Sequence, residues 1–178
     1  MMTLLIVLAT AAEAYLLGSI DTGILVSKYL YHDDVRNYGS GAAGMTNMLR
    51  AFGKKAAALT AAGDVLKGVA AVCIGRWLFG FLPENAAVSP YLGVYLTAIL
   101  AVVGHLKPLY FGFKGGKGVS STCGVMLMTF WWQALICYVI TIALIAITKF
   151  VSLGSLALVV LFGILVTATN WGNWLVIA

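Results

Sequence analysis

The chain has 178 residues, of which 62% are hydrophobic and only 10% are charged, and its formal net charge is +5. A soluble domain carries roughly 25% charged residues, so this composition excludes a soluble globular domain and indicates an integral membrane protein. The alternating segments of about ten residues that form membrane barrels are not seen. We therefore predict an all-α fold, a polytopic helical bundle whose backbone polar groups are satisfied internally.

Apolar stretches follow one another along the chain, separated by short polar segments. They lie near residues 3–27, 56–82, 91–106, 118–148 and 151–178. Several reach the length of about 18–20 apolar residues that a spanning helix needs. The first has no basic segment before it, so we expect a membrane helix there and not a cleaved signal peptide.

The lysines and arginines predict a topology. They gather in residues 28–55 and 107–117 and recur at Lys149, whereas the N-terminus and residues 83–90 have none. Cytoplasmic segments of membrane proteins are enriched in these residues. We therefore expect the basic segments in the cytoplasm, with the N-terminus and residues 83–90 outside.

This topology decides how residues 118–148 are interpreted. Both ends of the stretch are cytoplasmic by charge, so we predict two short helices with a turn near Phe130; one long tilted helix is the alternative. Residues 151–178 then hold one helix and part of another. The expected total is about seven transmembrane helices, the last possibly truncated, in a single domain, residues 1–178.

Two glycine-rich segments with basic residues interrupt the apolar stretches, "YGSGAAGMTNMLR" (38–50) and "FKGGKG" (113–118). The first contains G-x-G-x-x-G, but a dinucleotide site needs a strand before this pattern, and here a membrane helix is expected. The second is not a Walker A loop, because Gly118 follows Lys117 where Ser or Thr is required. Neither segment therefore predicts a nucleotide site.

Both segments have the chemistry of an anion site. Glycines leave successive backbone N–H groups open to an anion, and Arg50 is a bidentate donor suited to phosphate. A helix that starts near Gly118 would point its free N–H groups at the same place. Each segment could hold one phosphate from the cytoplasmic side. The alternative is that they are basic loops attracted to anionic lipid headgroups.

The sequence offers no standard catalytic base or protein nucleophile. His32 and His105 are not followed by Asp five residues on, and no G-x-S-x-G pattern occurs. Asp64 and Lys67 share one helix face, where they either pair with each other or contact a substrate. The acidic residues 33–34 are interpreted as solvated loop.

The three cysteines, Cys73, Cys123 and Cys137, lie in apolar stretches and are expected to be small buried hydrophobes. No Cys and His spacing predicts a metal site. We expect no metal, no cofactor and no nucleic-acid partner, and the sequence leaves the oligomeric state open, a monomer being compatible with it.

Five stretches together resemble a known family, the bacterial acyl-phosphate:glycerol-3-phosphate acyltransferases of the PlsY type. They occur in the family's order and cover most of the chain. They are "GSIDTGILVSKYL" (18–30), "VRNYGSGAAGMTNMLRAFGKKA" (35–56), "GDVLKGVAAV" (63–72), "GHLKPLYFGFKGGKGV" (104–119) and "KFVSLGS" (149–155).

The resemblance implies seven transmembrane helices in the bacterial cytoplasmic (inner) membrane, with the active site at the cytoplasmic face. It implies transfer of a fatty acyl group from acyl phosphate to the 1-hydroxyl of glycerol 3-phosphate, which gives lysophosphatidic acid and phosphate for phospholipid synthesis. Matching by position gives the catalytic candidates Ser40, Arg50 and Lys117. The phosphate-binding candidates are Gly39, Gly41, Thr46, Asn47, Lys114, Gly115, Gly116, Gly118 and Ser152. Further candidates are Asp64, Lys67 and His105.

The sequence departs from the family pattern at four places. Ala42 replaces the usual Asn, Met45 the usual Ala, and Lys149 the usual Arg. Family members also carry an H-x-x-N motif near the C-terminus, which "TNWGNWLVIA" lacks, through truncation or divergence. A transporter or flippase for a phosphorylated or lipidic solute is the main alternative, although no internal repeat supports it. A non-catalytic lipid-binding scaffold is the third.

Overall fold

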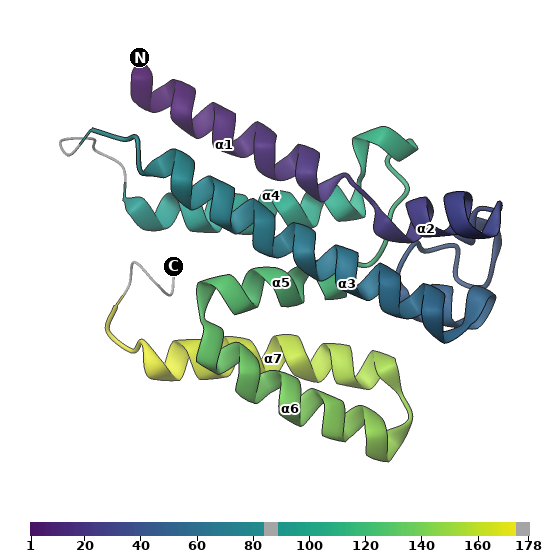
Figure 1. Ribbon diagram of the computed structural model, residues 1–178. Helices are drawn as coiled ribbons and strands as arrows, with labels where there is room; N and C mark the ends of the chain where they lie inside the picture. Colours follow the sequence, from purple (N-terminus) through teal and green to yellow (C-terminus); the bar gives the residue numbers. More distant parts are fainter. Residues whose placement is uncertain (84–88, 174–178) are drawn as a thin grey trace. The chain divides into compact units, whose positions relative to one another are not determined.

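The computed structural model describes residues 1–83 and 89–173 of the chain. These described residues form seven α-helices and two short 3₁₀ helices, and they contain no strand (Figure 1). The all-α prediction is therefore confirmed. In chain order the elements are α1 (Met2–Gly18), α2 (Thr22–Tyr31), η1 (Val35–Asn37), α3 (Met45–Phe79), α4 (Pro90–Leu106), η2 (Leu109–Phe111), α5 (Val119–Thr129), α6 (Trp131–Thr148) and α7 (Val151–Thr169).

Five segments of the described residues are long and apolar enough to cross a membrane. The first combines α1 with α2, and the others are provided by α3, α4, α6 and α7. The remaining helix, α5, has only 11 residues. The chain divides into two compact units, Met1–Val125 and Met126–Ala178, which are described separately.

The sequence suggested one continuous helix in the first apolar stretch, but the structure has two, α1 and α2. The stretch is broken between α1 and α2 because two side chains compete for the backbone there. The Ser19 hydroxyl donates to the Tyr15 carbonyl at 2.8 Å. The Asp21 carboxylate accepts from the Ile24 amide at 3.3 Å and caps the start of α2. The break places buried polar groups in the middle of a spanning segment.

The third helix starts earlier than its apolar stretch, at the end of the first glycine segment. Gly53 interrupts it with φ +85°, so α3 consists of a short first part and a long apolar second part. Glycine adopts this backbone conformation without the penalty that a Cβ would bring. The first part therefore leaves the axis of the spanning part and belongs to the loop region described below.

Helices α1, α3 and α4 of the first unit pack against one another, and α2 packs on α3 (Figure 1). Glycines allow the close approaches. A Cβ on Gly18 of α1 would lie 2.2 Å from the Ala101 carbonyl oxygen of α4. A Cβ on Gly124 of α5 would lie 2.1 Å from the Val65 carbonyl oxygen of α3. Small residues at such contacts are typical of membrane bundles, where van der Waals packing holds helices together.

The second unit pairs α6 with α7. Phe130, just before α6, contacts Phe162 of α7 with ring centroids 6.2 Å apart, and Gly154 packs against the Ile145 side chain. The predicted break at Phe130 is confirmed, since α5 ends at Thr129 and α6 begins at Trp131.

The cysteine prediction is only partly right. All three cysteines are free, but Cys137 alone is buried, whereas Cys73 is exposed at the protein surface and Cys123 is intermediate. Cys73 lies on the outward face of an apolar helix, so lipid and not protein would cover it. Its hydrophobic character fits both environments.

Candidate functional site

The first glycine segment is organised by one buried side chain, Asn47. Its amide nitrogen donates to the carbonyls of Val35 at 3.0 Å, Tyr38 at 2.9 Å and Ala42 at 3.1 Å. Its amide oxygen accepts from the Ser40 backbone N–H at 3.3 Å. The Asn47 side chain, predicted to bind a substrate phosphate, is thus engaged with the loop itself and holds the loop in shape.

Glycine is required next to this amide. Gly39 has φ +50°, and a Cβ there would lie 2.5 Å from the Asn47 Oδ1. Gly41 also has a positive φ, +69°. Between them the Ser40 side chain is exposed. The segment then enters α3 at Met45, with Gly44 as its N-cap, so free N–H groups of a helix start border the loop.

The second glycine segment rests on the end of α4. The Gly116 N–H donates to the His105 carbonyl at 3.2 Å. A Cβ on Gly115 would lie 2.0 Å from the same carbonyl oxygen, and a Cβ on Gly116 would lie 2.2 Å from the His105 Nε2. Helix α5 begins at Val119, immediately after Gly118, which confirms the predicted helix start.

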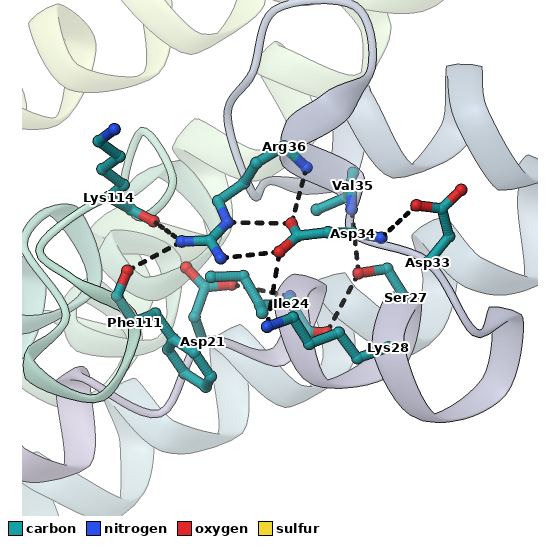
Figure 2. Close-up of polar contacts among 10 residues, drawn as sticks. All are labelled: Asp21, Ile24, Ser27, Lys28, Asp33, Asp34, Val35, Arg36, Phe111 and Lys114. Atoms are coloured by element: carbon teal, nitrogen blue, oxygen red, sulfur yellow. Dashed lines mark hydrogen bonds and ion pairs between the residues drawn. The ribbon is translucent and has the colours of Figure 1, made fainter.

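The two glycine segments touch. The Ala43 N–H donates to the Gly115 carbonyl at 3.3 Å. Arg36 forms a second connection, from its Nη1 to the Phe111 carbonyl at 2.8 Å and the Lys114 carbonyl at 3.3 Å (Figure 2). The two segments therefore adjoin each other. Two helix starts, of α3 and α5, border the same small region.

Cationic side chains around this region are exposed. Arg50, Lys114 and Lys117 all lie at the surface of the protein. Within the part of the chain that the structure describes, none of the three side chains forms an ion pair. They can therefore neutralise a bound anion without first giving up a partner. Thr46, at the second position of α3, is half-buried.

Ser152, the remaining phosphate-binding candidate, belongs to the second unit. It is exposed in the first turn of α7, and its backbone carbonyl accepts from the Ser155 hydroxyl at 2.9 Å. Its assignment to the site stays a prediction from the resemblance.

A cluster of charged side chains is buried within the first unit. Lys67 Nζ is 3.0 Å from the Asp64 carboxylate, donates to the Ile20 carbonyl at 2.7 Å, and lies 2.9 Å from His105 Nδ1. The Asp21 carboxylate is 3.7 Å from the same histidine nitrogen. The interpretation that Asp64 and Lys67 pair with each other is confirmed.

Sequence reasoning missed Asp34 and Arg36. Asp34 is not simply a solvated loop residue: both its carboxylate oxygens accept from the Arg36 guanidinium, at 2.9 and 2.7 Å. These hydrogen bonds lower the pKa of the Asp34 carboxyl to about 2, and the pKa of the Arg36 guanidinium is raised. Next to this pair the Tyr38 hydroxyl donates to Asp33, which lowers the pKa of the Asp33 carboxyl. The only sequence feature that could have predicted this pair is the spacing of Asp34 and Arg36, an acidic and a basic residue two positions apart just before the first glycine segment.

The fold and this site define a class: a helical membrane protein with two adjoining glycine-rich, basic segments at helix starts, supported by a buried charged cluster. The model of the glycerol-3-phosphate acyltransferase family matches residues 7–178. The chain belongs to this family.

Similar proteins agree with that assignment. A glycerol-3-phosphate acyltransferase of Clostridioides difficile is 46% identical over 145 residues, which is 82% of this chain and 69% of that protein. One from Thermoanaerobacter is 42% identical over 164 residues, 92% of this chain and 77% of that protein. A crystal structure of PlsY, an integral membrane glycerol 3-phosphate acyltransferase, in its glycerol 3-phosphate form has a TM-score of 0.82 at 33% identity and covers 96% of this chain and 80% of that one.

Proposed function

We propose that this protein transfers a fatty acyl group from acyl phosphate to the 1-hydroxyl of glycerol 3-phosphate. The products are lysophosphatidic acid and inorganic phosphate. The observation that carries the proposal is the direct contact between the two glycine segments, at 3.3 Å from the Ala43 nitrogen to the Gly115 oxygen, in a member of the glycerol-3-phosphate acyltransferase family. Two adjoining anion-binding segments suit two substrates that each carry a phosphate.

The reaction needs little chemistry from the protein. An acyl phosphate is a mixed anhydride and is already activated. The glycerol hydroxyl oxygen attacks the acyl carbon, the bond from that carbon to the phosphate oxygen breaks, and a substrate phosphate oxygen takes the hydroxyl proton. Juxtaposition and charge stabilisation then supply the catalysis, without a protein nucleophile and without a cofactor.

We assign the catalytic roles to Ser40, Arg50 and Lys117. The two cations stabilise the phosphates and the developing oxyanion, while the Ser40 hydroxyl orients a substrate oxygen. The phosphate-binding residues are those assigned by position, and Asn47 acts by shaping its loop. The exposure of Ser40, Arg50 and Lys117 supports these assignments.

In the membrane, we propose one domain with about seven crossings, the N-terminus outside and the site at the cytoplasmic face of the bacterial inner membrane. Residues 118–148 cross twice in this arrangement. Helix α5 rises only about 17 Å, roughly half of the hydrocarbon core, so the glycine segment before it has to sit below the headgroups. Irregular backbone at that depth is tolerated where it lines a polar cavity. That depth suits a donor whose acyl chain stays in the bilayer.

The proposal is tested with purified protein in proteoliposomes, given acyl phosphate and labelled glycerol 3-phosphate. We expect labelled lysophosphatidic acid and one phosphate released per product. Parallel reactions with acyl-CoA or acyl carrier protein as donor should give none. Entry of label into the vesicles without lysophosphatidic acid would instead favour a transporter.

Arg50 provides the sharpest variant. Replacing Arg50 with Ala should abolish acyl transfer while expression and thermal stability stay normal, because the side chain makes no ion pair with the described residues. Arg50→Lys should also perform poorly, since an ammonium cannot form a planar two-pronged contact. Lys54→Ala, which removes another exposed cation of α3, is the matched control. Normal turnover of Arg50→Ala would refute the assignment.

A further inference from the structure

We propose that Arg36 is a positioning residue that fixes the two glycine segments relative to each other, and that substrate affinity depends on this link. The inference rests on the proposed function. Arg36 lies in η1, before the first glycine segment, and its Nη1 donates to the Phe111 carbonyl, 75 residues further along the chain (Figure 2). The same nitrogen donates to the Lys114 carbonyl. One guanidinium thus connects the chain just before the first glycine segment with the chain at the second.

The guanidinium is held in place before it reaches the second segment. Its Nε and Nη2 donate to the two carboxylate oxygens of Asp34, an arrangement that fixes both angle and distance. Asp34 is itself fixed, because its carboxylate also accepts the Arg36 backbone N–H at 3.0 Å. Val35 between them is fully buried, and its N–H donates to the Ser27 hydroxyl at 3.2 Å. The bridge therefore starts from a rigid base.

The segment that Arg36 holds is strained. Gly112 and Phe113 both have positive φ, +66° and +59°. Phe113 has a Cβ, and a bulky residue is uncommon in this conformation, which persists where its surroundings enforce it. The carbonyls that bind Arg36 belong to Phe111 and Lys114, on either side of these two residues. The guanidinium therefore secures both ends of the strained turn that leads into Gly115.

Arg36 does not have the free donors that a phosphate ligand needs. A guanidinium has five N–H groups, and the four hydrogen bonds to Asp34, Phe111 and Lys114 leave one. Arg50, by contrast, is exposed without an ion pair to the described residues. The two arginines of this region therefore have different roles: Arg36 orders the site, and Arg50 meets the substrate.

Loss of the link should act on affinity. Without Arg36 the second segment samples other conformations, and only the fraction in the competent one binds, which raises the apparent dissociation constant by the inverse of that fraction. Bound substrate restores the same geometry, so turnover at saturation changes little. Arg36→Ala should raise KM for at least one phosphorylated substrate about tenfold or more, the scale of a lost charged hydrogen bond, with kcat within about threefold.

The experiment compares acyl transfer by the wild type, Arg36→Ala, Arg36→Lys and Arg36→Gln. Lysine cannot reproduce the fork and should resemble Ala, whereas Gln keeps one amide donor and should fall in between. Lys28→Ala is the matched control, because Lys28 also contacts Asp34, at 3.6 Å, through an exposed side chain. Its KM should stay within about twofold of wild type. Millimolar guanidinium should restore part of the affinity of Arg36→Ala, and methylammonium should not.

Unchanged KM in Arg36→Ala would overturn the inference, as would a loss confined to kcat, since that would put Arg36 at the reacting atoms. If the wild type makes no lysophosphatidic acid, the proposed function fails, and the link is tested without activity. Trypsin should then cleave at Lys114 and Lys117 faster in Arg36→Ala than in the wild type or in Lys28→Ala. Equal rates would overturn the link itself.

Discussion

A single methyl group at Gly115 should test the geometry of the site most directly. An added Cβ would lie 2.0 Å from the His105 carbonyl oxygen and 2.7 Å from the Pro108 Cδ, whereas ordinary van der Waals contact begins at 3.4 Å. The oxygen is backbone at the end of α4, and it also accepts the Gly116 N–H. It cannot move without disturbing the helix, so the glycine segment has to move.

The size of the effect follows from these distances. Restoring contact from 2.0 to 3.4 Å requires a shift of the segment by more than about 1 Å, and a misplacement of that size can cost about 100-fold in rate. The shift also disturbs the hydrogen bond from Ala43 to Gly115. We expect kcat/KM of Gly115→Ala to fall about 100-fold, or about 2.7 kcal/mol, with overpacking lowering stability by about 1–3 kcal/mol.

The assay measures initial rates of lysophosphatidic acid formation together with the thermal unfolding midpoint in detergent. Gly163→Ala is the control, because among the described residues nothing beyond the nearby backbone of its own helix lies within 4 Å of a Cβ added there, and it should match or exceed wild-type stability. A Gly115→Ala protein with wild-type kcat/KM and an unchanged midpoint would refute the reasoning, since the clash would then have been relieved without displacing the segment.

Two further predictions concern charge pairs. Asp64→Asn or Lys67→Met alone leaves a buried charge without its partner and should cost about 3–5 kcal/mol, measured as a lower unfolding midpoint, whereas the double variant should recover much of it. Arg36 lowers the pKa of the Asp34 carboxyl from 3.8 to about 2, so stabilisation by this pair is complete above about pH 5 and is lost as the pH falls toward 2. The midpoint difference between the wild type and Asp34→Asn should therefore be constant from about pH 5 to 8 and shrink only in acid; a change within the neutral range would contradict it.

Features set by local sequence could be predicted. The stretch at residues 91–106 matches α4, whose start is fixed by the Ser89 cap followed by Pro90. The break at Phe130 and the start of α5 after Gly118 were also expected, because glycine, tryptophan and charge mark helix ends locally. In each case the residues that decide the structure lie within a few positions of it.

Features that depend on distant partners could not be predicted. The Asp34 and Arg36 pair looks like ordinary solvated loop until Phe111 and Lys114 supply carbonyls 75 and 78 residues away. Asn47 shows a different limit. Position matching identified it as a site residue, but only the structure shows that its amide is bonded to three loop carbonyls. Sequence spacing predicts which residue types gather, but not where each hydrogen bond goes.

The buried charged cluster has a place in the same geometry. His105 is 2% exposed, its carbonyl holds Gly116, and its Nδ1 lies 2.9 Å from Lys67. Lys67 in turn binds Asp64 on its own helix and the Ile20 carbonyl at the break between α1 and α2. Polar groups from α3 and from the break between α1 and α2 therefore hold His105 of α4, the residue on which the second glycine segment packs. Charges this deep in an apolar bundle are costly unless they are paired, and the paired arrangement fixes the surface on which the segment rests.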